Sequence, residues 1–263
     1  MNIKAVILDL DGTLLDSHKQ VSRRNEAAVL ACHLQGIRVV FATARPPRTV
    51  ARLLPGSLQE LGAFVYYNGA QIDCRASDFR YHEAIGSELT AAVIDHCLAA
   101  DPNADLGLEV MDTWYALREV PEHVRMNVTG APIVQELELL KRHEATKILV
   151  SSYAAVDALI EAFGDRLNIV VTDQGELVQI ASAKVSKEAG VRMLCEQYGI
   201  GLKEALVFGD DYNDLGLFEA CGYPVAMGNA VAELKLAAHE VTATNDEDGV
   251  AVVLERWAGG GTA

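Results

Sequence analysis

Two carboxylates at the end of an apolar run are the first residues in the chain that could carry chemistry. Asp9 and Asp11 follow the apolar residues 5–8, and Gly12 comes directly after them. In extended backbone, residues two apart point to the same side, so both carboxylates would face one place. Crowded carboxylates repel one another and are costly to bury, and a divalent cation relieves both problems. The pair is a candidate metal site; the ordinary alternative is a solvated turn at the end of a strand, where Asp and Gly are common.

A second acidic group follows an apolar run near the C-terminal end of the chain. Asp210, Asp211, Asn213 and Asp214 come after residues 205–209. By themselves they could simply cap the start of the next helix. If the strands before the two acidic groups are neighbours, however, the carboxylates would surround one ion, and this joint pattern favours a metal site. A few carboxylates with water suit Mg²⁺ better than Ca²⁺ or Zn²⁺.

Other polar side chains fall where strands are expected to end or helices to begin. Thr43 and Arg45 follow one apolar run, Asn68 follows another, and Lys187 opens a later helix. In an open parallel sheet, ligands bind at the carboxyl ends of the strands, so these side chains would gather at the same edge as the acids. Taken alone, Thr43 is an ordinary cap, and Arg45 and Lys187 are ordinary surface charges.

Alternating strands and helices are the elements that would position this edge. Residues 5–10, 37–43 and 63–69 are nearly continuous apolar runs, the pattern of strands buried on both faces. A helix is expected over 22–35, with Ser22 as its N-cap. The other expected elements are a helix from Pro46, helices over 185–199, 212–222, 230–239 and 247–257, and strands over 205–210 and 223–229. This alternation predicts an α/β fold with a Rossmann-like parallel sheet.

Residues 82–184 show a different pattern and interrupt this alternation. Helical patterns over 87–101 and 153–163 are mixed with strand-like segments over 106–112, 114–118, 146–152 and 167–182, with a hairpin-type turn at Asp173–Gly175. The segment is long enough to form a hydrophobic core of its own. We therefore expect an α/β domain at 82–184 that is inserted into a core domain made of 1–81 and 185–263.

The composition is that of a globular protein with an excess of acidic residues. The 263 residues carry a formal net charge of −15, and half of them are hydrophobic. Nucleic acids and anionic membranes are bound through an excess of Lys and Arg, so neither is expected as the main partner. This argument does not exclude a small phosphorylated ligand, because one local cation can reverse the field within a cleft.

The cysteines and the chain start bear on the cellular compartment. The five cysteines are widely spaced and form no C-x-x-C pair, which is typical of reduced thiols. The N-terminal apolar run is too short for a signal peptide, and no uncharged apolar stretch approaches the roughly 20 residues of a membrane span. A cytoplasmic location is expected, and nothing in the sequence indicates the oligomeric state.

Six motifs together resemble the haloacid dehalogenase superfamily of phosphotransferases, and most closely its Cof-type (subclass IIB) sugar-phosphate phosphatases. They are DLDGTLLD (9–16), ATAR (42–45), NGA (68–70), SKEAG (186–190), GDDYNDLGLF (209–218) and AMGNA (226–230). The resemblance extends over the whole chain and implies that the inserted domain is an α/β cap. Ala44 stands where the family usually has Gly; if that position needs a positive φ, the methyl group costs on the order of 1–2 kcal/mol.

The resemblance implies a role for each matching residue. Asp9 would be the nucleophile that becomes an aspartyl phosphate, and Asp11 the general acid and base. Thr43, the Ala44 backbone, Lys187 and Asn213 would hold the phosphoryl oxygens. Mg²⁺ would be bound by Asp9, the Asp11 backbone carbonyl, Asp210 and Asp214, and Asp214 would also orient Lys187. Neighbouring carboxylates are expected to raise the pKa of Asp11, which suits a general acid.

Candidates for substrate contacts beyond the phosphate are weaker. Asn68 and Arg45 lie at strand ends of the core, and His123, Arg125 and the cluster 141–143 (Lys-Arg-His) belong to the cap. For the cap residues, solvated surface is the preferred interpretation.

The resulting expectation is a Mg²⁺-dependent phosphatase of small phosphorylated metabolites, with sugar phosphates as the first candidates. Two alternatives stay open. A phosphomutase would pass the aspartyl phosphate to a sugar instead of water, and a non-catalytic protein would only bind a phosphometabolite or regulate another process.

Overall fold

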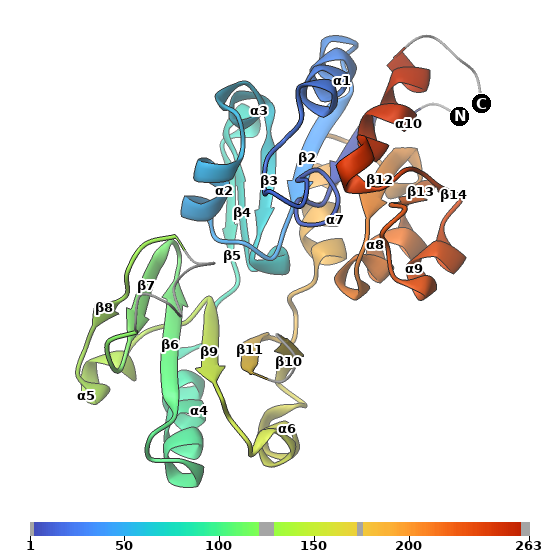
Figure 1. Cartoon of the computed structure of the whole chain (residues 1–263). Helices are drawn as coiled ribbons and strands as arrows, with labels where there is room; N and C mark the ends of the chain where they lie inside the picture. Colours follow the sequence, from blue (N-terminus) through green and yellow to red (C-terminus); the bar gives the residue numbers. More distant parts are fainter. Residues whose placement is uncertain (1–2, 121–128, 173–175, 259–263) are drawn as a thin grey trace. The chain divides into compact units, whose positions relative to one another are not determined.

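The computed structural model describes residues 3–120, 129–172 and 176–258 (Figure 1). The chain divides into two compact units: the first contains Met1–Arg45, Val50–Tyr81 and Ser186–Ala263, and the second contains Pro46–Thr49 and His82–Val185. Pro46–Thr49 and Val185 thus belong to the second unit, whereas the sequence-based boundaries assigned them to the first.

An eight-stranded sheet forms the centre of the first unit, in the order β14-β13-β12-β1-β2-β3-β4-β5. β1 pairs in parallel with β2 on one side and with β12 on the other, and Leu8 lies opposite both Phe41 and Phe208. Asp9 and Asp210 therefore leave neighbouring strands at the same edge. The strands are β1 (Ala5–Leu8), β2 (Arg38–Ala42), β3 (Ala63–Tyr66), β4 (Gln71–Cys74), β5 (Phe79–His82), β12 (Ala205–Gly209), β13 (Tyr223–Ala226) and β14 (Glu240–Val241).

The helices of the first unit follow the expected alternation. α1 (Arg23–Leu34) begins after Ser22, whose hydroxyl accepts a hydrogen bond from the Asn25 amide at 3.0 Å, as the sequence predicts. α10 (Gly249–Ala258) packs on α1, and the Ala251 amide donates to the Asn25 side chain at 2.9 Å. The remaining helices are α2 (Pro47–Leu53), whose first three residues belong to the second unit, α3 (Gly56–Leu61), which was not expected as a separate helix, α7 (Lys187–Gln197), α8 (Leu215–Ala220) and α9 (Ala232–Ala237).

α7 is the helix that matters most for the edge of the sheet. It begins after Ser186, whose hydroxyl caps the Ala189 amide at 3.0 Å, and it packs against β2, β3 and β4. The packing of α7 therefore places its first residue, Lys187, near the carboxyl ends of the strands.

Three strands of this sheet were not expected from the sequence: the two-residue strand β14, and β4 and β5. β4 pairs antiparallel with β3 directly after the turn at Tyr67–Gly69, and β5 follows β4 at the edge of the sheet. β4 and β5 have only four residues each. A run that short gives too few alternations to distinguish a strand from a loop.

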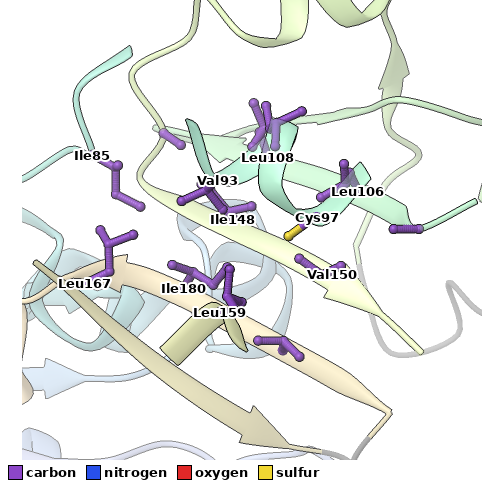
Figure 2. Close-up of a cluster of buried hydrophobic side chains, with 14 of the residues drawn as sticks. Ile85, Val93, Cys97, Leu106, Leu108, Ile148, Val150, Leu159, Leu167 and Ile180 are labelled. Carbon is purple, nitrogen blue, oxygen red and sulfur yellow. The ribbon is translucent and has the colours of Figure 1, made fainter. Parts of the chain in front are cut away.

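The second unit has a six-stranded sheet and a hydrophobic core of its own. Figure 2 shows part of this core, where side chains of α4, including Val93 and Cys97, meet those of the sheet, including Leu108 and Ile148. The sheet order is β10-β11-β9-β6-β7-β8. The elements are α4 (Ser87–Ala100), β6 (Asp105–Val110), β7 (Thr113–Ala116), β8 (Ile133–Val134), α5 (Leu137–Leu140), β9 (Lys147–Ser151), α6 (Val156–Phe163), β10 (Leu167–Thr172) and β11 (Leu177–Ser182).

Some sequence-based expectations lie outside the described residues, namely those on the turn at Asp173–Gly175 and on the cap candidates His123 and Arg125. Among the residues that the structure does describe, every helix is too short or too polar to cross a lipid bilayer. All five cysteines are buried free thiols.

Candidate active site

A buried ion pair joins the end of β1 to the start of α7. Lys187 Nζ donates to Asp9 Oδ1 at 2.5 Å and to Asp214 Oδ1 at 2.8 Å. The exposed fractions of the three side chains are 0% for Lys187, 9% for Asp9 and 1% for Asp214. Burial opposes the charge of Lys187, but Asp214 and Asp9 outweigh it and hold the pKa of the ammonium group above its usual value. The site thus contains a fixed positive charge beside Asp9.

Three carboxylates converge on this point. One oxygen each of Asp9, Asp210 and Asp214 lies within 4.8 Å of the others. The second oxygen of Asp214 accepts hydrogen bonds from the backbone amides of Asp210 at 3.1 Å and Asp211 at 3.3 Å. Thr13 Oγ1 donates to Asp210 Oδ1 at 2.9 Å. The carboxylates are therefore held in place by the backbone and by a hydroxyl group, not only by Lys187.

The electrostatics of this acidic cluster favour a further cation. Burial, opposed by Lys187, raises the pKa of Asp9 well above its usual value, and Asp214 and Asp210 raise it more. Burial also raises the pKa of Asp210 to about 6, against the hydrogen bond from Thr13. In both cases burial disfavours the charged carboxylate and Asp214 adds to this effect, so a further cation would favour the ionised form. The donors are hard oxygen atoms from at most three carboxylates, and this set fits Mg²⁺, which prefers oxygen ligands and retains several waters.

Gly12 is required where the chain turns past Asp210. Its φ is +75°, and a Cβ atom at this position would lie 2.1 Å from Asp210 Oδ2. Any side chain would therefore collide with the carboxylate, in a backbone conformation that L-residues rarely adopt.

Asp11 is held by two cations, which differs from the sequence-based expectation. Arg45 donates Nε to Asp11 Oδ2 and Nη2 to Oδ1 at 2.6 Å, and Lys19 Nζ donates to Oδ1 at 2.8 Å. Burial raises the pKa of Asp11, but the hydrogen bonds and charges of Arg45 and Lys19 outweigh it and lower the pKa below its usual value. The expectation that neighbouring carboxylates raise this pKa is therefore wrong.

Lys19 is a site residue that the sequence analysis missed. It lies at a φ of +60° in a tight turn, where Asp16 Oδ1 accepts hydrogen bonds from the His18 and Gln20 amides, each at 2.9 Å. The sequence Asp-Ser-His-Lys at 16–19 indicates a turn, but it does not indicate the direction in which the lysine side chain points.

Thr43 and Ala44 lie at the end of β2. The Thr43 side chain is buried, and its hydroxyl accepts a hydrogen bond from the Arg45 amide at 3.2 Å. Ala44 is not among the residues with a positive φ, so the cost that the sequence analysis attached to its methyl group does not arise.

Asn68 and Asn213 meet beside the acidic cluster. Asn213 Nδ2 donates to Asn68 Oδ1 at 3.2 Å, and the Asn68 amide donates to the Thr43 carbonyl at 2.9 Å. Asn68 has a φ of +55°, which its short amide side chain tolerates better than most residues. The ends of β2, β3 and β12 are thus connected through polar groups.

Two of the three cap candidates at 141–143, Lys141 and His143, have side-chain partners within the second unit. Lys141 forms an ion pair with Asp95, and His143 Nε2 shares a hydrogen bond with Gln135 Oε1 at 2.7 Å. The His143 ring stacks on Tyr115 with centroids 4.3 Å apart. These contacts agree with an ordinary structural role.

Comparisons with known proteins agree with this geometry. A family model described as haloacid dehalogenase-like hydrolase matches residues 6–254. The chain is 26% identical to "5-amino-6-(5-phospho-D-ribitylamino)uracil phosphatase YitU" of Bacillus subtilis, over 96% of each chain. It is 27% identical to a phosphatase of the same description, YbjI of Escherichia coli, over 97% of this chain and 96% of that one.

Solved structures give the same result. A crystal structure from Thermotoga maritima superposes with a TM-score of 0.88 at 26% identity over 97% of each chain. A haloacid dehalogenase-like hydrolase from Bacteroides thetaiotaomicron superposes with a TM-score of 0.79 at 26% identity, over 97% of this chain and 99% of that one. The expected α/β fold and the resemblance to Cof-type phosphatases are confirmed. The chain therefore belongs to the haloacid dehalogenase-like hydrolases.

Proposed function

We propose that this phosphatase hydrolyses small phosphorylated metabolites in two steps, with Mg²⁺ and through an aspartyl phosphate on Asp9. The observation that carries the proposal is the contact of Asp9 with Lys187 inside a cluster of carboxylates at the strand ends. A carboxylate that attacks a phosphate ester is repelled by the negative charge of the ester, and positive charge at the site removes this repulsion.

The metal would be held by the side chains of Asp9, Asp210 and Asp214 and by the Asp11 backbone carbonyl. Bound Mg²⁺ supplies positive charge that relieves the excess of carboxylates and polarises the phosphoryl group. Lys187 supplies a second positive charge, and its contact with Asp214 keeps it aimed at Asp9.

In the first step, an Asp9 carboxylate oxygen forms a bond to phosphorus while the bond from phosphorus to the substrate oxygen breaks. Asp11 gives its proton to that leaving oxygen. In the second step, Asp11 takes a proton from water, the water oxygen attacks phosphorus, and inorganic phosphate leaves Asp9 as a free carboxylate. Lys187, Thr43, the Ala44 backbone and Asn213 would hold the phosphoryl oxygens during both steps.

The contacts of Asp11 support its role as the base of the second step. Its low pKa and its contacts with Arg45 and Lys19 favour the carboxylate, which is the base. To act as the acid, Asp11 has to be released from Arg45 at one or both of its carboxylate oxygens, because Arg45 alone donates to both of them.

The first unit would be the catalytic core and the second unit the cap that selects the substrate. Two relatives, YitU and YbjI, are named as phosphatases of 5-amino-6-(5-phospho-D-ribitylamino)uracil. A phosphorylated polyol chain therefore belongs in a substrate panel beside sugar phosphates and nucleotides. The buried free thiols suit a reducing compartment, so the proposal includes a cytoplasmic location.

The experiment measures phosphate release from an aryl phosphate and from the substrate panel. We expect activity with Mg²⁺, none after EDTA, and a loss of at least about 10³-fold in D9N, which removes the attacking carboxylate with little change in shape. D211N is the matched control, because the Asp211 side chain accepts a hydrogen bond from the adjacent Tyr212 amide at 2.8 Å, and the oxygen of an asparagine amide can still accept it. Activity that survives EDTA contradicts the metal, and an active D9N contradicts the nucleophile. Phosphate release without an added sugar excludes an obligatory mutase.

A further inference from the structure

One loop outside the acidic cluster is hydrogen-bonded to both chain segments that carry the cluster. This brace loop, Met227–Val231, follows β13 and contains the end of the AMGNA motif. Its two terminal amides hold the end of β12, because Met227 donates to the Gly209 carbonyl at 3.1 Å and Val231 donates to the Asp210 carbonyl at 2.9 Å.

The same loop reaches the turn after Asp11 through a side chain. Asn229 Nδ2 donates to the Gly12 carbonyl at 2.8 Å, across 217 positions of sequence. Asn229 Oδ1 accepts a hydrogen bond from the Asn245 amide at 3.0 Å. A backbone carbonyl only accepts and a backbone amide only donates, so the two partners determine which atom of the Asn229 side chain faces which.

The position of Gly12 matters because this residue lies against Asp210. A Cβ atom on Gly12 would be 2.1 Å from Asp210 Oδ2, and the next residue, Thr13, donates its hydroxyl to Oδ1 at 2.9 Å. The turn therefore sets where the Asp210 carboxylate lies relative to Asp9. Glycine has no side chain that could fix the turn by contacts of its own. The hydrogen bond from the Asn229 side chain to the Gly12 carbonyl fixes it instead.

We propose that Asn229 is a positioning residue for the acidic cluster: its amide fixes the Gly12 peptide and thereby keeps Asp9 and Asp210 placed to share one divalent cation. The inference rests on the proposed function and extends it to a residue that touches neither the substrate nor the metal. Residues that orient metal ligands without contacting the metal lower metal affinity or activity by about 10- to 100-fold when they are replaced.

The chain offers a matched control in Asn245. Its Nδ2 donates to the Leu15 carbonyl at 2.9 Å, which is the same kind of bond to the same segment, three residues after Gly12. Asn245→Asp leaves its backbone amide free to bind Asn229. Asn229→Asp keeps the acceptor for Asn245 but places an oxygen against the Gly12 carbonyl. Both variants add one negative charge, which by itself would strengthen cation binding.

The experiment measures Mg²⁺ binding to the full chain by titration calorimetry, together with thermal unfolding and the Mg²⁺ dependence of aryl phosphate hydrolysis. For N229D we expect Mg²⁺ affinity to fall by about 10-fold or more, a parallel fall in kcat at low Mg²⁺ and partial recovery of kcat at high Mg²⁺. For N245D we expect Mg²⁺ affinity within about twofold of the wild type, even if the melting temperature falls as much as in N229D.

Unchanged Mg²⁺ affinity in N229D overturns the inference. An equal loss of affinity in N229D and N245D also overturns it, because Asn229 would then act only through the general stability of the turn. The binding measurement keeps the inference separate from the proposed function. A wild-type protein that binds Mg²⁺ but hydrolyses no phosphate ester contradicts only the proposed function, and one that binds no Mg²⁺ contradicts both.

Discussion

Lys187 Nζ lies 2.5 Å from Asp9 Oδ1, although the two residues are 178 positions apart in the sequence. Asp9 follows β1 and Lys187 opens α7, which packs across β2, β3 and β4. The fold therefore brings a buried ammonium group to a buried carboxylate, and Asp214 completes a group of two carboxylates around one positive charge. This group is the basis of the first prediction.

Replacing Lys187 with methionine removes the charge and keeps most of the volume. Two buried carboxylates then lose their partner, and breaking a buried ion pair in this way costs about 3–5 kcal/mol in the free energy of unfolding. Loss of a charge that stabilises the transition state lowers kcat by about 10²- to 10³-fold. Denaturant unfolding without Mg²⁺ and hydrolysis of an aryl phosphate measure the two effects.

Lys184→Met is the control for this substitution. The Lys184 side chain is 79% exposed and pairs with Glu83 at 3.3 Å. Exposed pairs contribute about 1 kcal/mol or less, so we expect little change in stability and none in kcat. If K187M is as stable and as active as K184M, the buried ion pair does not have the role given to it here.

Mg²⁺ should stabilise the folded protein, because the acidic cluster exists only when the chain is folded. A ligand at 100 times its dissociation constant adds about 2.7 kcal/mol. For a chain of this size, we expect the melting temperature to rise by roughly 5–10 °C. Thermal unfolding with and without Mg²⁺ measures this shift, and D210N should largely abolish it whereas D211N should not. An equal Mg²⁺ shift in D210N and the wild type would mean that the ion binds elsewhere.

The pH dependence of the metal-free protein follows from the same cluster. Burial raises the pKa of Asp210 from 3.8 to about 6, so between these values the folded state binds more protons than the unfolded state. The contribution of Asp210 to the free energy of unfolding is therefore present at low pH and is lost as the pH rises toward 6. Since protons compete with the cation, Mg²⁺ should stabilise the protein more at pH 7.5 than at pH 5. Unfolding midpoints at the two pH values test this, and a larger Mg²⁺ effect at pH 5 would contradict the prediction.

The strand ends could be predicted from the sequence because strands buried on both faces are continuous apolar runs. β1, β3 and β12 are buried at every residue, and β2 is buried at every residue after Arg38, which confirms the pattern. The polar residues that follow these runs therefore had to lie at the strand ends. Ser22 and the helix after it were predictable for a similar reason, since an N-cap is a local signal.

The contacts of Lys19 and Asn229 could not be predicted, because they depend on the paths of loops. Lys19 reaches Asp11 from a turn in which its own φ is positive, and Asn229 reaches Gly12 across 217 positions. Composition indicates that such a segment is a loop but not where its side chains point. The pKa of Asp11 was predicted in the wrong direction for the same reason: its cationic partners come from two such loops.

Replacing Lys19 with methionine should move the pH profile of the reaction. The hydrogen bond and charge of Lys19 contribute to the low pKa of Asp11, so the pKa should rise when they are removed. Asp11 must be deprotonated to act as the base, so the acidic limb of the kcat profile should shift to higher pH. Lys4→Met is the control, because Lys4 pairs with Glu204 away from the site. A profile that is unchanged in K19M, or one that shifts to lower pH, would contradict the role given to Lys19.

A comparison of Gly12→Ala with Gly36→Ala separates the effect of backbone strain from the effect of displacing the Asp210 carboxylate. Gly12 and Gly36 both have a positive φ, +75° and +85°, so an alanine costs about 1–2 kcal/mol of backbone strain at either position. No atom lies within 4 Å of a Cβ on Gly36, whereas a Cβ on Gly12 would meet Asp210 Oδ2 at 2.1 Å. Both variants should therefore lose stability, but only G12A should lose Mg²⁺ affinity and activity. If G12A loses no more activity than G36A, the turn does not position Asp210, and Gly12 is needed only for its positive φ.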